Sequence, residues 1–183
     1  MIIKGLIGGG EEAQKGVCEK FDLMTRLATI IDMYSMPEEG EGEMETMGTP
    51  MLVVRVAISL TWAIICGNKE VKKDMYHHER LVASLVAVIG KERGEWKVMK
   101  AGALGAIGNI AMGSNEVRKG LYDVEGLIAL LVSVVGNEGE EWKVARENAL
   151  SVIGNIALSS DEVRRRLYNY PDLIASLVAV IGA

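Results

Sequence analysis

The sequence has few of the residues on which metal centres and disulfide frameworks depend. Of its 183 residues, only two are cysteine and two are histidine. Cys18 and Cys66 lie far apart and match no metal-ligand spacing, so we expect two reduced core thiols in a cytoplasmic or nuclear protein. His77 and His78 are adjacent, and successive side chains on a helix diverge by about 100°, so the pair alone cannot share a metal ion. We expect no metal and no cofactor.

Other absences exclude further classes of protein. No apolar run reaches the ~18 residues that a membrane-spanning helix needs. The net charge of −5 gives no general attraction for nucleic acid, which makes nucleic-acid binding an unfavoured prediction. No serine or cysteine stands in a recognised nucleophile motif, and no glycine-rich phosphate loop follows a strand, because no strand is predicted. We therefore predict no catalytic residues and a protein that is not an enzyme.

The most informative feature that the sequence does contain is an internal repeat. The segment 142–182 closely copies the segment 46 residues before it. The copied clusters are Trp96-Lys97-Val98 with Trp142-Lys143-Val144, Ile107-Gly108-Asn109-Ile110-Ala111 with Ile153-Gly154-Asn155-Ile156-Ala157, and Glu116-Val117-Arg118 with Glu162-Val163-Arg164. Several clusters at one fixed offset indicate a repeat array.

The sequence pattern within each repeat unit predicts three helices and no strand. Ser114 is a suitable N-cap for a short helix that ends near Gly126. A strongly apolar second helix follows and ends at Gly136, in the manner of a C′ glycine. After an acidic turn, a long third helix begins at Trp142, and its apolar residues fall three and four positions apart. We expect an all-α fold.

The end of the third helix resembles the armadillo repeat. Its Asn109-Ile110-Ala111 recurs as Asn155-Ile156-Ala157, and a small residue, Ala103 or Ala149, stands six residues before each asparagine. The family's glycine before the second helix is matched by Gly126 and replaced by Arg80 and Asp172 in other units. HEAT repeats are the close competitor. The resemblance implies a right-handed α-solenoid, an armadillo-like superhelix of three-helix repeats with a period of 46 residues.

The repeat also predicts the organisation of the chain. We expect one armadillo-like domain over residues 1–183, made of a partial unit 1–32, an acidic insertion loop 33–49, and repeat units 50–92, 93–138 and 139–183. The glutamate-rich insertion is either a solvated loop or a docking loop for a basic partner.

The last unit is expected to end after its second helix, with its apolar face uncovered. The side chains on that face are Ile174, Leu177, Val178, Val180 and Ile181. Solenoids normally end in polar capping units. A fragment of a longer array, end-to-end dimerisation and an unusually packed terminus therefore stay open.

A binding groove is implied by the resemblance rather than by composition. In armadillo proteins the third helices line a concave groove, where an asparagine of each unit hydrogen-bonds the backbone of an extended peptide. The matching positions here are Asn109 and Asn155, with Ala63 in the preceding unit. The tryptophan positions of importin-α-like arrays hold Ser59, Gly105 and Ser151, which argues against recognition of nuclear localisation signals.

The rest of the implied groove is small or polar, with Gly102, Gly105 and Ala106 in one unit and Asn148, Ser151 and Val152 in the next. Small residues permit close approach of a ligand, and they equally permit tight helix packing. The asparagines have a structural alternative as well, because buried amides usually find partners inside the protein.

The tryptophans are expected to be mainly structural. Trp96 and Trp142 begin successive third helices and should wedge each turn against its neighbour, because aromatic rings dominate burial where they can reach it. Trp62 has no equivalent in other units and could belong to the core or to the groove.

Basic residues recur along the short helices. Lys72, Arg118 and Arg164 share one repeat position, and Lys73, Lys119 and Arg165 share the next. Stacked short helices would align them as a basic stripe. Such a stripe is either a solvated edge or a footprint for an acidic peptide or a nucleic-acid backbone.

The sequence therefore predicts a non-catalytic protein–protein interaction scaffold that binds an extended peptide along its third helices. One alternative is a structural or assembly module that forms a homo-oligomer through uncapped terminal helices. The other is nucleic-acid binding through the basic stripe.

Overall fold

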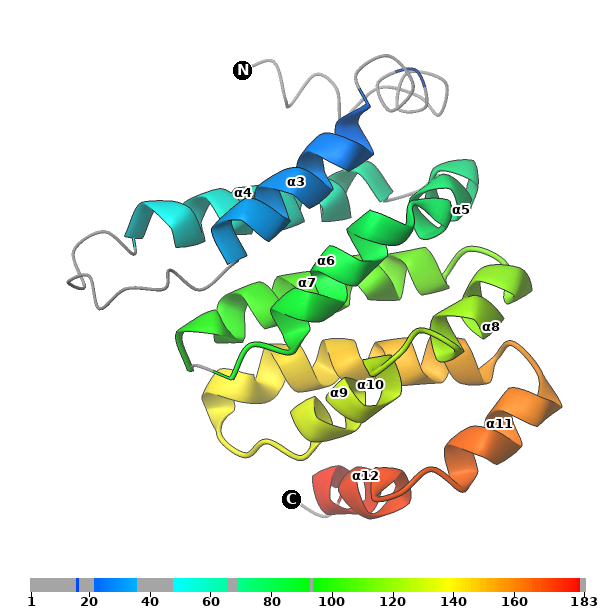
Figure 1. The fold of residues 1–183 in the computed structure, drawn as a ribbon. Coiled ribbons are helices and arrows are strands. Elements are labelled where there is room, and N and C mark those ends of the chain that lie inside the picture. The colour runs from blue at the N-terminus through cyan, green and yellow to red at the C-terminus, as the bar shows by residue number, and fades with distance from the viewer. Residues whose placement is uncertain (1–15, 17–21, 36–47, 66–68, 93, 182–183) are drawn as a thin grey trace.

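The computed structural model describes residues 16, 22–35, 48–65, 69–92 and 94–181 (Figure 1). Every regular element in these ranges is helical, so the all-α prediction is confirmed. Both cysteines, the N-terminal segment 3–7, Asn68 and most of the predicted insertion fall outside the described residues.

Three kinds of helix follow one another along the chain. The long helices are α4 (Gly48–Ile65), α7 (Lys97–Ala111) and α10 (Lys143–Ala157). The apolar helices are α3 (Leu23–Ser35), α6 (Glu79–Ile89), α9 (Leu127–Val135) and α12 (Leu173–Ile181). The short helices are α5 (Lys69–His77), α8 (Asn115–Tyr122) and α11 (Asp161–Tyr168). Short 3-10 turns, Gly94–Trp96 and Glu140–Trp142, lead into α7 and α10.

The long helices lie beside one another, and the apolar helices cover one side of them. α7 packs against α4 on one flank and against α10 on the other (Figure 1). On the covered side, α3 contacts α4, α6 contacts α7, and α9 contacts α10. Among the described helices, the apolar ones do not cover the opposite side of the three long helices, which we call the long-helix face.

The helix starts follow from local sequence. Ser114 is the N-cap of α8, as predicted, and its Oγ accepts a hydrogen bond from the Val117 amide at 3.2 Å. Ser160 does the same for α11 through the Val163 amide, also at 3.2 Å. Each cap satisfies an amide that has no partner inside its helix.

The residue just before three of the apolar helices, α3, α9 and α12, has a left-handed backbone conformation. Its φ is 45° at Asp22, 74° at Gly126 and 60° at Asp172. Helix α6 departs from this pattern, because Arg80 lies inside the helix and His78 is its N-cap. Glycine adopts a positive φ without strain, which accounts for Gly126. Gly136 ends α9, but its φ of −74° is right-handed, so this stop does not require glycine, contrary to the C′ prediction.

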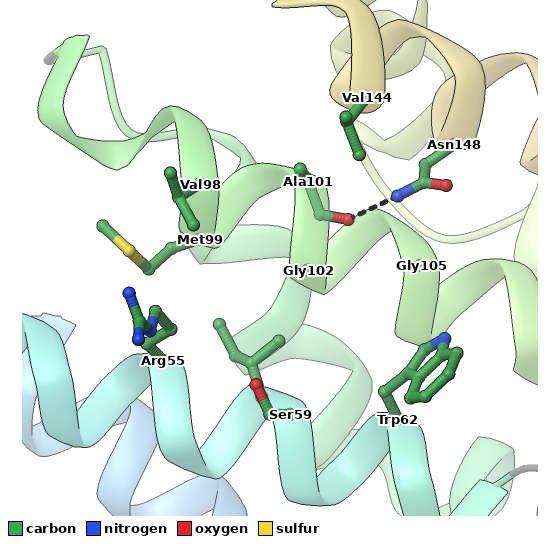
Figure 2. Close-up of a pocket in the computed structure, with 11 residues that line it drawn as sticks. Arg55, Ser59, Trp62, Val98, Met99, Ala101, Gly102, Gly105, Val144 and Asn148 are labelled. Carbon is green, nitrogen blue, oxygen red and sulfur yellow. Dashed lines mark hydrogen bonds between the residues drawn. The ribbon is translucent and has the colours of Figure 1, made fainter.

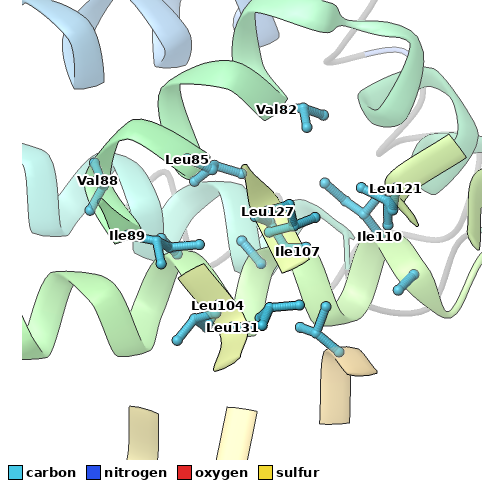
Figure 3. Packing of buried hydrophobic residues seen from close by; sticks show 14 of the residues in the cluster. Val82, Leu85, Val88, Ile89, Leu104, Ile107, Ile110, Leu121, Leu127 and Leu131 are labelled. Carbon is cyan, nitrogen blue, oxygen red and sulfur yellow. The ribbon is translucent and has the colours of Figure 1, made fainter. Parts of the chain in front are cut away.

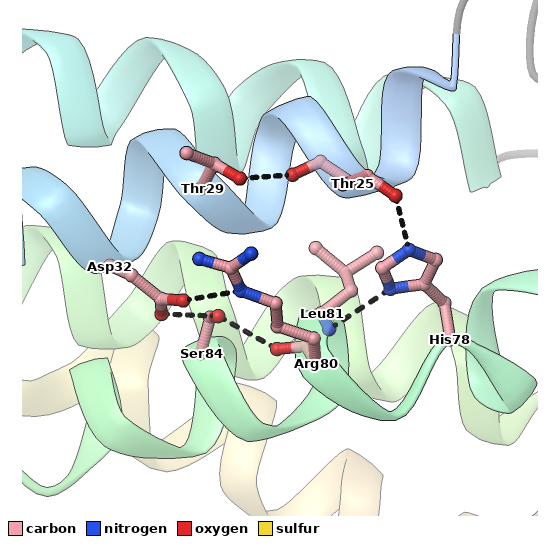
Figure 4. A network of polar contacts seen from close by, with 7 residues as sticks. All are labelled: Thr25, Thr29, Asp32, His78, Arg80, Leu81 and Ser84. Carbon is pink, nitrogen blue, oxygen red and sulfur yellow. Dashed lines mark hydrogen bonds and ion pairs between the residues drawn. The ribbon is translucent and has the colours of Figure 1, made fainter.

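His78 belongs to a polar network that joins α3 to α6 (Figure 4). Its Nδ1 accepts from the Leu81 amide at 3.3 Å, and its Nε2 lies 2.9 Å from Thr25 Oγ1. About two helical turns further along α3, Asp32 pairs with Arg80 at 3.0 Å and accepts from the Ser84 hydroxyl. The network fixes the register of the two helices.

The core lies between the apolar helices and the long helices (Figure 3). Leu85 and Ile89 of α6, Leu104 and Ile107 of α7, and Leu127 and Leu131 of α9 are almost completely buried there. Ala103 and Ala149 are also fully buried, and their small side chains let the helices approach closely.

Candidate functional site

A pocket of about 370 Å³ opens on the long-helix face, between α4, α7 and the first half of α10 (Figure 2). Its lining from α4 is Arg55, Ile58, Ser59 and Trp62; from α7, Val98, Met99, Ala101, Gly102 and Gly105; and from α10, Val144 and Asn148. The lining is mainly apolar with a few polar groups, which is the usual make-up of a binding pocket.

Of the predicted groove residues, the structure brings Ser59, Gly102, Gly105 and Asn148 together in this pocket. Asn109, Asn155 and Ser151 are on the same long helices but do not line it. Trp62, for which the sequence left two roles open, lies on the pocket side with 48% of its surface exposed.

The glycines of α7 shape the floor of the pocket. A Cβ atom on Gly102 would lie only 2.9 Å from Ile58 Cγ2, so the close contact between α4 and α7 requires glycine there. A Cβ on Gly105 would lie 3.4 Å from Asn148 Nδ2 and 3.5 Å from Trp62 Cδ1, near van der Waals contact. Gly102 thus serves helix packing, whereas Gly105 leaves room beside Trp62.

The amide groups of the three asparagines donate to backbone carbonyls. Asn148 Nδ2 donates to Ala101 O at 2.8 Å, and Asn155 Nδ2 lies 3.5 Å from Gly108 O. Both links join α10 to α7. Asn109 Nδ2 instead donates to Gly105 O within its own helix, at 3.2 Å. The donor atoms therefore have structural partners, as the alternative interpretation of these residues expected.

Each of the three long helices has an exposed apolar side chain at the same repeat position. Leu52, Val98 and Val144 follow one another at intervals of 46 residues, and each lies near the start of one of the long helices. They are 52%, 60% and 58% exposed. Because the same position is apolar and uncovered on all three helices, the face offers a row of apolar contacts beside the pocket.

Arg55 is the charged pocket residue, and sequence reasoning missed it. It is exposed, and the part of the chain that the structure describes provides no hydrogen bond or ion pair for its guanidinium. The equivalent positions on the other long helices are Ala101 and Glu147, so no repeat pattern points to it.

The tryptophans at the starts of the long helices are packed, as predicted. Trp96 is 8% exposed and Trp142 is half-buried. The ammonium groups of Lys97 and Lys100 lie 5.3 and 5.5 Å from the centre of the Trp142 ring, within cation–π range. Burial lowers the pKa of Lys100, and the charge of Glu92 opposes this shift.

Much of the predicted basic stripe is engaged in contacts with the protein itself. Arg118 Nε donates to Ala111 O at 2.9 Å, and Arg164 donates to Ala157 O at 3.2 Å, so each satisfies a carbonyl at the end of a long helix. Lys72 is buried. Lys73 lies 3.4 Å from Glu116.

Lys119 and Arg165, the other predicted members, are exposed. Beyond the predicted stripe, Arg166 pairs with Asp123 at 3.5 Å and covers the Tyr122 ring. The cations on the short helices are thus divided between internal contacts and solvent.

The last apolar helix leaves part of its surface open. Ile174 and Val178 of α12 are 40% and 64% exposed, whereas Leu173 is buried. Leu177 and Val180 are half-buried, and the side chain of Ile181 lies outside the described set.

The described residues include no group of three or more His, Cys, Asp or Glu side chains placed to hold a metal ion. Among the same residues, no helix combines the length and apolarity needed to cross a membrane. Comparison of the chain with protein-family models and with curated proteins finds no match.

Proposed function

We propose that the chain is a non-catalytic protein-interaction scaffold of armadillo type, a right-handed solenoid of 46-residue units that binds an extended peptide along its long helices. The observation that carries the proposal is the pocket between α4, α7 and α10, together with the exposed apolar row Leu52, Val98 and Val144. The low cysteine content, with Cys18 and Cys66 far apart in the sequence, suggests the cytoplasm or the nucleus as its location.

The long-helix face has what peptide binding needs. Apolar side chains on helices present binding area at a low cost in backbone conformational entropy, because the helices are already ordered before association. Trp62 adds an aromatic ring at the pocket edge, and aromatic residues are enriched where interfaces gain most of their free energy. The carbonyl oxygen of Asn148 can accept from a peptide amide, because its bond to Ala101 uses only Nδ2.

The test is selection of binders from a random peptide library displayed on phage, followed by affinity measurement with variants. Val144→Glu places a charge in the apolar row and should abolish binding of the selected peptides. Asn109→Ala combined with Asn155→Ala tests whether the asparagines hold the peptide backbone, and peptide binding should be lost if they do. Val178→Glu on α12 is the control and should leave binding unchanged. Selected peptides that bind Val144→Glu as well as the parent protein would refute the proposal.

A second candidate function is assembly through α12, because the apolar side chains of Ile174 and Val178 are exposed on this helix. Light scattering over a range of protein concentrations tests it. A dimer that Val178→Glu dissociates would favour assembly, and a monomer at all concentrations would exclude it.

A further inference from the structure

The charges on the three long helices differ in sign from those of the protein as a whole. The chain carries a net charge of −5. The long helices nevertheless hold five cations, Arg55, Lys97, Lys100, Lys143 and Arg146, against one carboxylate, Glu147. The three long helices therefore carry a net positive charge within a chain that is negative overall.

Most of these cations already have partners within the protein. Lys97 lies 3.0 Å from Glu141, and Lys143 lies 3.8 Å from Glu140. Arg146 donates to the carbonyls of Asn137 and Gly139 at 2.8 and 3.0 Å. Lys100 is nearly buried against Trp142.

Arg55 is different, because its guanidinium lines the pocket without a hydrogen bond or ion pair from any described residue. An arginine fork presents paired N–H donors whose geometry matches a carboxylate. The rest of the lining excludes a purely ionic ligand. Ile58, Val98, Met99 and Val144 supply apolar walls, and Trp62 supplies a ring. A phosphate group alone would leave these walls unused.

We propose that this pocket selects acidic peptide segments, binding an Asp or Glu carboxylate at Arg55 and a neighbouring apolar side chain between Trp62 and Val144. This inference rests on the proposed function, since it names the partner chemistry of the same face. Arg55 and Trp62 are seven residues apart on α4, which corresponds to about 10 Å along the helix axis. A peptide in the extended polyproline II conformation advances about 3.1 Å per residue with three residues per turn, so an acidic and an apolar side chain three residues apart lie on the same face and span about that distance.

The test uses short synthetic peptides, fluorescently labelled, with Asp, Asn or Lys at one position and Leu or Ser three residues later. Fluorescence anisotropy gives the dissociation constant of each peptide with the whole chain. The Asp–Leu peptide should bind about tenfold more tightly than the Asn–Leu peptide, because a charge-assisted hydrogen bond replaces a neutral one. Its affinity should fall as salt is added.

Charge reversal on the protein identifies the residue responsible. Arg55→Glu should remove the preference for Asp and transfer it to the Lys–Leu peptide. Arg165→Glu, a reversal at an exposed arginine on α11, is the matched control and should leave the order of affinities unchanged. Arg55 has no described structural partner, so both variants should keep the parent circular dichroism spectrum and melting temperature.

The outcomes separate this inference from the proposed function. If the Leu peptides bind equally well with Asp, Asn or Lys, and Val144→Glu abolishes their binding, the face binds peptides but the acidic preference is refuted. If Arg55→Glu leaves the preference for Asp intact, Arg55 is not the carboxylate site and the inference also fails. If no peptide binds, and none is selected from the random library, the proposed function falls and this inference with it.

Discussion

The two contacts that α7 makes with its long neighbours are built in different ways. On the α10 side, Asn148 and Asn155 donate to carbonyls of α7. On the α4 side, the position equivalent to Asn148 is Gly102, where an added Cβ would lie only 2.9 Å from Ile58 Cγ2. The position equivalent to Asn155 is Asn109, and its amide bonds within α7 itself. Side-chain hydrogen bonds therefore join α10 to α7, whereas α4 packs against α7 by close steric fit.

The difference teaches how a repeat can carry a specific site. Two nearly identical units need the same helix arrangement, but the residues that hold the helices together can change. At Gly102 the close approach to Ile58 takes the place of the hydrogen bond, and the pocket opens beside Trp62, where Gly105 also has no side chain. The predictions below test this contrast, from the largest expected effect to the smallest.

Gly102→Ala should break the α4–α7 contact. The added methyl group meets Ile58 Cγ2 at 2.9 Å, so the unfolding free energy should fall by about 1–3 kcal/mol, as is typical of overpacked cores. Urea denaturation followed by circular dichroism measures this.

The matched control is Gly154→Ala on α10, where an added Cβ meets nothing within 4 Å. It should raise stability by about 0.5–1 kcal/mol, the usual gain on replacing a mid-helix glycine by alanine. Equal stability of the two variants would mean that the contact is not sterically limited.

Asn148→Ala should loosen the α7–α10 contact. Loss of the 2.8 Å bond to Ala101 O should lower the unfolding free energy by about 1 kcal/mol, the typical net value of one hydrogen bond. Asn109→Ala removes only a bond within α7, and the better helix propensity of alanine offsets part of that loss. An Asn109→Ala variant less stable than Asn148→Ala would contradict the assignment of the linking role to Asn148.

Lys100→Val should remove the contribution that Lys100, at the α7–α10 contact, makes to the alkaline pH dependence of stability. The residue of α4 at the equivalent position is Val54, which is fully buried. Burial lowers the pKa of Lys100 below 10.5 in the folded protein. At pH values between the folded pKa and 10.5, the unfolded chain therefore binds more protons than the folded protein. The parent protein should therefore gain stability as pH rises from the folded pKa towards 10.5, and this gain should be absent in Lys100→Val. Denaturation midpoints at a series of alkaline pH values check the sign.

The sequence predicted the elements better than it predicted the site, for a physical reason. Helix type and helix ends depend on local pattern, so Ser114 and the apolar periodicity were sufficient. His78 was missed as a cap, because histidine is rarely chosen for that role from sequence.

The pocket depends on residues that the repeat does not preserve. Arg55 has no counterpart of the same charge, and the position of Trp62 could be resolved only by packing. The partners of Asn148 and Asn155 lie on another helix, so their hydrogen bonds could not be assigned from spacing within one unit.

The most direct test of the account is to follow the three indole N–H resonances by NMR while the Asp–Leu peptide is added to isotope-labelled protein. Trp62 lines the pocket, whereas Trp96 and Trp142 are packed at the helix starts. The account predicts that the Trp62 resonance shifts and saturates while the other two stay nearly unchanged, and that Arg55→Glu abolishes the shift. A titration that moves only the α12 methyl groups, or leaves Trp62 unchanged at saturation, would contradict it.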